Sequence, residues 1–220
     1  MIKLFISSFD NTLIDEEEAI PTSTMFELDR VKQKGIKFCV ITNRLTEDVL
    51  YYNQDYPFID YIIALNGGIL LDVVRGKLDT FQAFTKNELG EISTQYRGKK
   101  ILFYTKDAVS TDIPQEPVYK IEIQGTKKVL IPNVNSSIFQ KDKEKYLEMS
   151  KNTVWDALSK IKENEMLAVI GNESDEILLE KIPKTYVVRN APKSLKDKAK
   201  RMTKSNKQKG VEIVLKEEIK

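Results

Sequence analysis

The chain has 220 residues, of which 41% are hydrophobic and 31% are charged, with 35 Lys and Arg against 33 Asp and Glu. This length fits one large domain or two small ones with a substantial core. A net charge of +2 argues against bulk nucleic acid as a partner. No apolar run is long enough to span a membrane and no leader peptide is recognisable, so we expect a cytoplasmic protein without a membrane partner.

The sequence contains no histidine and a single cysteine, Cys39. An intrachain disulfide, a Ser-His-Asp triad and an ordinary zinc site are therefore excluded. Cys39 lies in the apolar run 36–41, where a small buried side chain is expected rather than a reactive thiol. Hydrolytic chemistry in this chain would depend on carboxylates, hydroxyls, lysines and a hard cation.

The first predicted strand leads directly into a polar segment. Residues 3–6 form an apolar run at the N-terminus, a pattern typical of a buried parallel strand. The polar side chains that follow are Ser7, Ser8, Asp10, Asn11 and Thr12. Ligands of open α/β sheets bind where the chain leaves the carboxyl end of a strand, so this segment is the first candidate for chemistry.

Helices and strands then alternate. A helix is predicted over 21–35, because Met25, Leu28 and Val31 recur every three residues and Gly35 is a typical stop. The strand 38–41, a helix capped by Thr46 and the strand 61–65 follow. This alternation predicts a parallel sheet covered by helices.

The pattern changes between about residues 76 and 146. A helix is predicted over 81–96 and strands over 100–104, 118–124 and 127–132, with Gly125-Thr126 at hairpin spacing. This segment is interpreted as a small α+β insert. The first pattern returns afterwards, with the helix 153–162, the strand 166–170 and the turn 171–176.

The segment 193–209 is rich in lysine. Leu195, Ala199 and Met202 have helical spacing, which predicts a helix with a buried apolar stripe and a solvated charged face. A nucleic-acid patch is the less favoured interpretation, because no aromatic residues are interleaved with the charges.

Residues 8–12 resemble the first motif of the haloacid dehalogenase (HAD) phosphohydrolases, Asp-x-Asp-Gly-Thr. Asp10 and Thr12 match the motif. Ser8 takes the place of the nucleophilic aspartate, and Asn11 takes the place of the glycine. The resemblance is to the Cof-like phosphatase branch of the superfamily.

Further motifs extend this resemblance along nearly the whole chain. Thr42-Asn43-Arg44 is similar to the second motif, and Asn66-Gly67-Gly68 is similar to the turn that precedes the cap in this branch. Residues 148–151 resemble the third motif, with Lys151 as the charge-neutralising lysine, and residues 171–176 stand where the family has Gly-Asp-x-x-Asn-Asp. The resemblance implies a doubly wound, parallel-sheet α/β core. This core consists of residues 1–75 and 147–220, with a small α+β cap at 76–146.

The resemblance also implies phosphoryl transfer, in which a carboxylate attacks phosphorus and Mg²⁺ bridges phosphate and carboxylates. Ser8 stands at the nucleophile position and Asp10 at the acid/base position. Thr42, Asn43 and Lys151 would bind phosphate, and Lys151 would also assist catalysis. The residues placed at the metal are Asp10, Asn172 and Asp175, with Glu176 nearby, and those expected to face the cap are Arg44 and Asn66.

Two departures weaken this chemistry. Ser8 and Asn172 are neutral where the family has carboxylates, so we expect Mg²⁺ to bind weakly or not at all. A serine nucleophile needs a general base, and the chain has no histidine. The site is also more positive than the family's metal-free site, which would let it bind phosphate directly. Whether Ser8 is natural or introduced is open, although several departures together favour natural drift.

Two functions are compatible with these residues. The first is a HAD-like phosphatase of small phosphorylated metabolites, such as sugar phosphates, that is impaired or inactive at the chemical step. The second is a non-enzymatic module on the same scaffold that binds a phosphometabolite or a protein. A decayed pocket that binds nothing in particular is the alternative to either.

Overall fold

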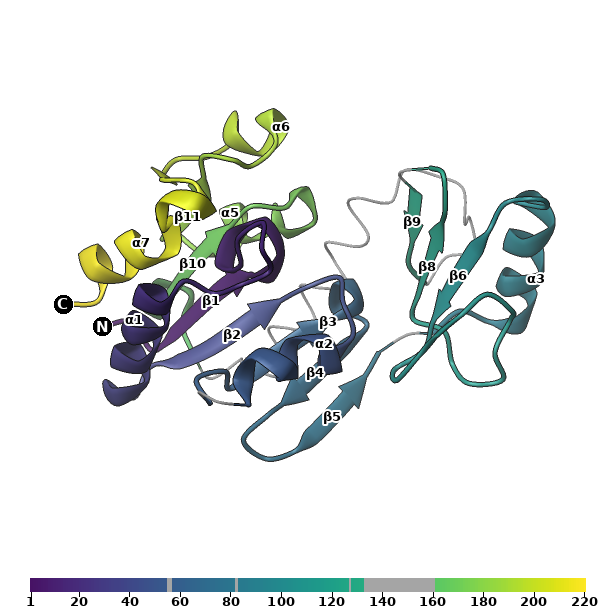
Figure 1. Ribbon diagram of the computed structural model, residues 1–220, viewed down its shortest axis with the longest axis horizontal. Coiled ribbons are helices and arrows are strands. Elements are labelled where there is room, and N and C mark those ends of the chain that lie inside the picture. The colour runs from purple at the N-terminus through teal and green to yellow at the C-terminus, as the bar shows by residue number, and fades with distance from the viewer. Residues whose placement is uncertain (55–56, 82, 127, 133–160) are drawn as a thin grey trace.

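The computed structural model describes residues 1–54, 57–81, 83–126, 128–132 and 161–220. They form an eight-stranded main sheet in the order β12-β11-β10-β1-β2-β3-β4-β5 and a four-stranded sheet in the order β7-β6-β8-β9 (Figure 1). The predicted α/β class is confirmed, with a parallel-rich central sheet and accompanying helices.

The main sheet is parallel from β12 to β3, and β4 and β5 run antiparallel to their neighbours. Its strands are β1 (Leu4–Ser8), β2 (Lys37–Ile41), β3 (Tyr61–Ala64), β4 (Ile69–Asp72), β5 (Lys77–Thr80), β10 (Met166–Ile170), β11 (Thr185–Val188) and β12 (Met202–Thr203). β5 belongs to this sheet although it lies beyond residue 75, where the sequence predicts the end of the first core segment.

Strand β1 lies between β2 and β10, and all its residues are buried. A central parallel strand is covered on both faces, which explains why its sequence is apolar without alternation. Phe5 of β1 stacks on Phe38 of β2 with ring centroids 5.0 Å apart. This packing fixes the strand whose carboxyl end carries Ser8.

The helices associated with the main sheet are α1 (Thr22–Gln33), α2 (Thr46–Leu50), α5 (Leu178–Lys181), α6 (Lys193–Lys196) and α7 (Gly210–Glu218). Short helical turns are η1 (Phe9–Leu13), η2 (Tyr51–Asn53), η3 (Leu65–Gly67), η4 (Glu163–Glu165), η5 (Glu173–Asp175) and η6 (Asn206–Gln208). α1 and α7 lie side by side (Figure 1). The Arg30 guanidinium of α1 donates to the main-chain oxygens of Leu215 and Ile219, which joins the two helices.

A second unit is inserted in the chain between β5 and β10. It consists of α3 (Lys86–Gln95), β6 (Ile101–Tyr104), β7 (Val109–Ser110), β8 (Lys120–Ile123) and β9 (Lys128–Leu130), and we call it the inserted unit. It has its own small apolar core, in which Ile92, Phe103 and Ile121 are buried. The hairpin predicted at Gly125-Thr126 is confirmed, because β8 and β9 pair antiparallel.

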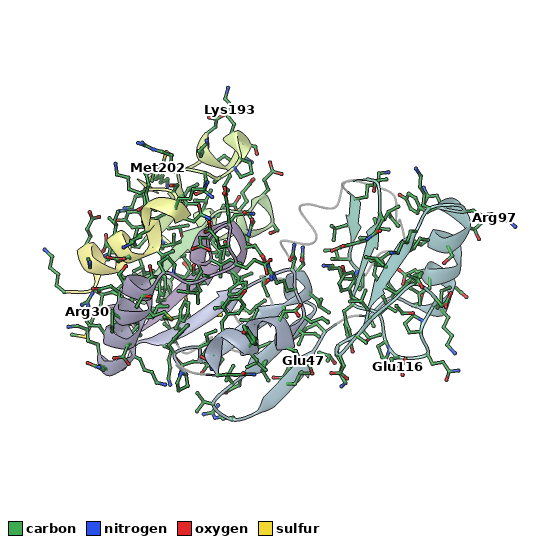
Figure 2. All side chains as sticks on the ribbon, viewed as in Figure 1. Arg30, Glu47, Arg97, Glu116, Lys193 and Met202 are labelled. Atoms are coloured by element: carbon green, nitrogen blue, oxygen red, sulfur yellow. The ribbon has the colours of Figure 1, made fainter. Side chains whose placement is uncertain are left out.

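The predicted helix over 193–209 is wrong beyond its first turn. α6 ends at Lys196, and Met202 lies in β12 with 49% of its surface exposed, at the edge of the molecule (Figure 2). The main-chain N–H of Val187 in β11 donates to the carbonyl of Arg201. Pairing with β11 therefore takes up the main-chain groups that a helix would have used.

Candidate functional site

The loops that follow β1, β2 and β10 meet at the carboxyl ends of these three adjacent strands. Ser8 is the last residue of β1, and the loops carry Asp10, then Thr42, then Asn172 and Asp175. Ser8 bonds to Asp175 and Thr42 bonds to Asp10 through their side chains, and the Asn172 side chain bonds to the main chain of Asp10. The convergence expected from the sequence is therefore present in the structure.

The Ser8 hydroxyl is fully buried and faces Asp175. Its Oγ donates to Asp175 Oδ2 at 2.5 Å and accepts from the N–H of Gly171 at 3.3 Å. The other oxygen of the Asp175 carboxylate accepts from Ser174 Oγ at 3.1 Å. The single hydroxyl proton of Ser8 is therefore used inside the protein.

Asp175 is a buried carboxyl group, with 4% of its surface exposed. Burial raises its pKa from 3.8 to about 6, and the hydrogen bonds from Ser8 and Ser174 oppose this rise. The negative charge of Asp10 also raises the pKa. Asp175 is thus more readily protonated than an exposed aspartate.

The Asp10 carboxylate accepts hydrogen bonds at both oxygens. Thr42 Oγ1 donates to Oδ2 at 3.0 Å, and Arg44 Nε donates to Oδ1 at 2.7 Å. Arg44 also donates to Glu18 Oε1 at 2.9 Å and lies over the Phe9 ring, 5.5 Å from its centroid. Its guanidinium therefore lies between two carboxylates that attract it, and the expectation that Arg44 faces the cap stays a prediction.

Asn172 joins the loop after β10 to the loop after β1. Its amide Nδ2 donates to the main-chain oxygen of Asp10 at 3.2 Å. A similar bond runs from Asn190 Nδ2 to the main-chain oxygen of Asn11 at 2.8 Å. Asn11 has a left-handed backbone with φ of 56°, a conformation that asparagine tolerates better than most residues. Amide groups therefore satisfy the carbonyls of this turn.

Gly171 permits close packing beneath the site. A Cβ at this position would lie 2.3 Å from Thr12 Oγ1 and 2.9 Å from Val188 Cγ2, both too close for a side chain. Thr12 Oγ1 is buried and has no hydrogen-bond partner among the described residues. The approach of the two loops therefore depends on the missing side chain at position 171.

The described residues of the candidate site do not fit a Mg²⁺ ion. Within the described ranges, no group of three or more Asp, Glu, His or Cys residues is arranged to hold a metal. Asp10 and Asp175 are engaged by Arg44 and Ser8, respectively. Asn172 turns an amide N–H, rather than an oxygen, toward the Asp10 carbonyl. Magnesium requires hard oxygen ligands in near-octahedral geometry, and this arrangement does not offer them.

The remaining predicted site residues are placed as follows. Lys151 lies outside the described residues, as does most of the predicted helix 153–162. Asn43 lies between Thr42 and Arg44, and its main-chain oxygen accepts from Lys120 Nζ at 2.7 Å. Asn66 has a buried Oδ1 with no partner in the described part of the chain. Glu176 pairs with Lys198 and does not join the cluster around Ser8.

Sequence reasoning missed Glu18 and Lys120. Glu18 had no motif to mark it. Lys120 and Glu122 alternate with apolar residues in a predicted strand, so their side chains share one face of that strand. Two opposite charges on one face of a strand in the small insert could have marked Lys120 as a candidate.

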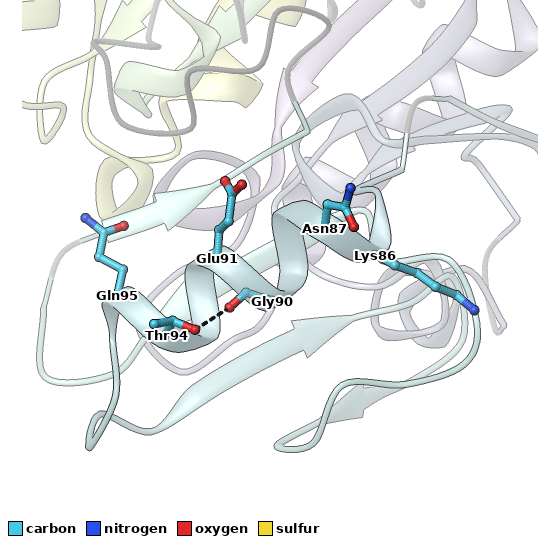
Figure 3. A pocket seen from close by; sticks show the side chains of 6 residues that line it. All are labelled: Lys86, Asn87, Gly90, Glu91, Thr94 and Gln95. Carbon is cyan, nitrogen blue, oxygen red and sulfur yellow. Dashed lines mark hydrogen bonds between the residues drawn. The ribbon is translucent and has the colours of Figure 1, made fainter.

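A separate hollow lies along α3 of the inserted unit (Figure 3). Its volume is about 660 Å³, and its lining residues are Lys86, Asn87, Gly90, Glu91, Thr94 and Gln95. None of them belongs to the cluster at the strand ends.

In the described residues no helix combines the length and apolar character needed to cross a bilayer.

Comparisons with known proteins agree with this fold. The family model of haloacid dehalogenase-like hydrolases matches residues 5–164. A haloacid dehalogenase-like hydrolase from Bacteroides thetaiotaomicron has a TM-score of 0.77 at 17% identity, with 99% of both chains covered. One from B. subtilis also has a TM-score of 0.77, at 15% identity, with 99% of this chain and 100% of that chain covered.

A sugar phosphatase of HAD subclass IIB has a TM-score of 0.77 at 16% identity, with 98% of both chains covered. At such identities the structural likeness shows the fold alone. No match was found among curated proteins.

Proposed function

This chain belongs to the haloacid dehalogenase-like hydrolases, and we propose that it binds small phosphorylated metabolites, such as sugar phosphates, with phosphoryl transfer impaired or lost. The observation that carries the proposal is the Ser8–Asp175 hydrogen bond of 2.5 Å. Ser8 stands at the end of the central strand, where the family resemblance places the nucleophilic aspartate. A buried, neutral hydroxyl directed at another protein group replaces that carboxylate.

The surroundings of Ser8 support the loss of nucleophilic attack. A nucleophile must reach the reacting atom, and a hydroxyl must also be relieved of its proton. Ser8 Oγ is buried between Asp175 and the N–H of Gly171. With both neighbours inside the protein, the oxygen is not presented to a ligand.

The environment of Asp10 supports the loss of acid catalysis. A general acid must present a proton to the leaving oxygen. Both oxygens of Asp10 instead accept hydrogen bonds, from Thr42 and from Arg44. In this arrangement the Asp10 carboxylate accepts the hydrogen bonds that Thr42 and Arg44 could otherwise donate to a bound anion.

Those same donors support anion binding. A hydroxyl and a guanidinium converge on the Asp10 carboxylate from the second motif, and a guanidinium is well suited to bind phosphate oxygens. The neutral Ser8 leaves one negative charge fewer beside an incoming phosphate. We propose that phosphate shares the Thr42 and Arg44 donors with the Asp10 carboxylate or displaces it from them, with Asn172 completing the site.

If catalysis is lost completely, the protein is a non-enzymatic module that binds a phosphometabolite. The closed Ser8–Asp175 pair favours this form, because it leaves the scaffold intact while removing the nucleophile. The inserted unit would then serve as a cap that selects the organic part of the ligand. Inorganic phosphate is the simplest probe of the anion site, because both the impaired enzyme and the binding module would bind it there.

Calorimetric titration with inorganic phosphate in the presence of a chelator tests the binding claim. We expect phosphate to bind the unaltered protein and to bind Arg44→Met much more weakly, because that variant loses the guanidinium. Arg97→Met is the matched control, since Arg97 is exposed on the inserted unit (Figure 2). Absence of phosphate binding, or an equal loss in both variants, would contradict the proposed site.

A further inference from the structure

The inserted unit reaches the candidate site through a buried lysine. Lys120 is the first residue of β8, and only 2% of its surface is exposed. Lysine is rarely buried to this extent unless it is paired. The groups that surround the ammonium therefore indicate its role in the structure.

The Lys120 ammonium contacts three groups of the protein. Nζ lies 2.7 Å from the main-chain oxygen of Asn43, to which it donates, and 2.6 Å from Glu122 Oε1. It also lies 3.9 Å from the centroid of the Tyr104 ring, within cation–π range. An ammonium donates and does not accept hydrogen bonds, so these groups are suited to hold its charge.

Holding a charge in this position is unfavourable unless each partner is well placed. Burial lowers the pKa of Lys120, and the Glu122 carboxylate opposes that shift. An apolar side chain of similar length would fill the same space without the desolvation cost. What an apolar side chain would not provide is a donor for the Asn43 carbonyl.

The Asn43 carbonyl belongs to the segment that binds Asp10. Thr42 and Arg44 flank Asn43, and both donate to the Asp10 carboxylate. The other side of this segment is held by η3, where the Asn66 N–H donates to the Thr42 oxygen at 3.1 Å. Hydrogen bonds from η3 and from Lys120 thus both hold the segment.

A second contact of the inserted unit supports this arrangement. Tyr119, next to Lys120, packs so closely on Gly68 that a Cβ at position 68 would lie 3.0 Å from Tyr119 Cβ. Tyr119 is buried with the core of the main sheet. Residues 119 and 120 therefore dock the inserted unit beside both η3 and the Thr42–Arg44 segment.

We propose that Lys120 is a positioning residue, which holds the Thr42–Arg44 segment from the inserted unit in the conformation that binds an anion. The identity of the anion rests on the proposed function, whereas the contact itself does not. Phosphate affinity at the strand ends would then depend on a lysine that touches no ligand.

Hydrogen exchange and phosphate titration of Lys120→Met test this inference together. The control is Lys128→Met, because Lys128 lies on the adjacent strand β9 and contacts Tyr96 within the inserted unit. We expect faster amide exchange in residues 42–46 of Lys120→Met and unchanged exchange in Lys128→Met. We also expect about tenfold weaker phosphate binding in Lys120→Met, as for the loss of a hydrogen bond to a charged group, with Lys128→Met unaffected.

The two readouts separate this inference from the proposed function. If the unaltered protein binds no phosphate, the proposed function fails, and amide exchange still decides whether Lys120 orders the segment. Unchanged exchange in residues 42–46 overturns the inference. Faster exchange with unchanged phosphate affinity also overturns it, because Lys120 would then hold the segment without positioning it for binding. If Lys120→Met does not fold, the same comparison is made with Lys120→Arg, which retains the charge but redirects the donors and is expected to give a smaller change in the same direction.

Discussion

Ser8 Oγ donates a hydrogen bond of 2.5 Å to the carboxylate of Asp175, a residue 167 positions further along the chain. The bond joins the end of β1 to the turn η5 after β10, and both side chains are buried. Ser8 is therefore a structural partner of a second residue of the candidate site. The consequences of this pairing can be measured in both stability and activity.

Asp175 should make stability depend on pH. Its pKa is about 6 in the folded protein, against an ordinary value of 3.8. As the pH rises through this window, the unfolded chain loses the proton first, so the folded state loses relative stability. The full loss, about 3 kcal/mol for two pKa units, is reached above pH ~6 and is absent below pH ~4.

Urea unfolding of Asp175→Asn across this pH range measures the effect. The variant stays neutral and its amide oxygen still accepts from Ser8, so its stability relative to the unaltered protein should increase as the pH rises from ~4 to ~8. Asp197→Asn is the control, because Asp197 is exposed. A stability difference for Asp175→Asn that does not change with pH would contradict the burial argument.

Gly171→Ala should destabilise the fold. The added Cβ would meet Thr12 Oγ1 and Val188 Cγ2 at distances that force a displacement, and overpacking of this kind costs about 1–3 kcal/mol. Gly90→Ala is the opposite case, since it lies within α3 and nothing lies within 4 Å of an added Cβ. This helical substitution should stabilise by about 0.5–1 kcal/mol. Thermal unfolding of both variants measures these changes in stability. An unchanged unfolding temperature for Gly171→Ala would contradict the close packing at position 171.

Asp10→Asn should strengthen phosphate binding in the absence of metal. The substitution removes the negative charge that Thr42 and Arg44 now serve. The amide oxygen that replaces the carboxylate can still accept one hydrogen bond, but it carries no charge to repel phosphate or hold Arg44. We therefore expect an affinity gain of about tenfold, equivalent to about 1.4 kcal/mol. The measurement is calorimetric titration with phosphate and a chelator.

Glu18→Gln provides the comparison for Asp10→Asn. Glu18 also pairs with Arg44, but 63% of its side chain is exposed, and exposed ion pairs contribute little. Its substitution should therefore change the phosphate affinity much less. Weaker phosphate binding by Asp10→Asn would show that the carboxylate is needed for the site rather than in competition with it.

The sequence predicted those parts of the fold that depend on local patterns. The apolar run of β1 and the polar residues immediately after it placed Ser8 and Asp10 at a strand end, which the structure confirms. Helix α1 was recognisable from the spacing of Leu28 and Val31, both of which are buried. In these segments the local pattern and the tertiary packing agree.

The sequence could not predict features set by distant partners. Met202 has helical spacing with Leu195, but pairing of its strand with β11 overrides that spacing. The direction of Arg44 depends on Glu18 and Asp10 together, and no motif encodes that geometry. Lys120 acquires its role only because β8 docks beside Asn43.

The most direct test of the account is a phosphatase assay with Mg²⁺ on four proteins: the unaltered chain, Ser8→Asp, Asn172→Asp and the double variant. We predict little or no metal-dependent turnover of sugar phosphates by the unaltered chain, and strong turnover only when both carboxylates are present. A folded unaltered protein with strong Mg²⁺-dependent turnover would contradict it, because Ser8 and Asn172 would then sustain the chemistry that their hydrogen bonds are argued to prevent.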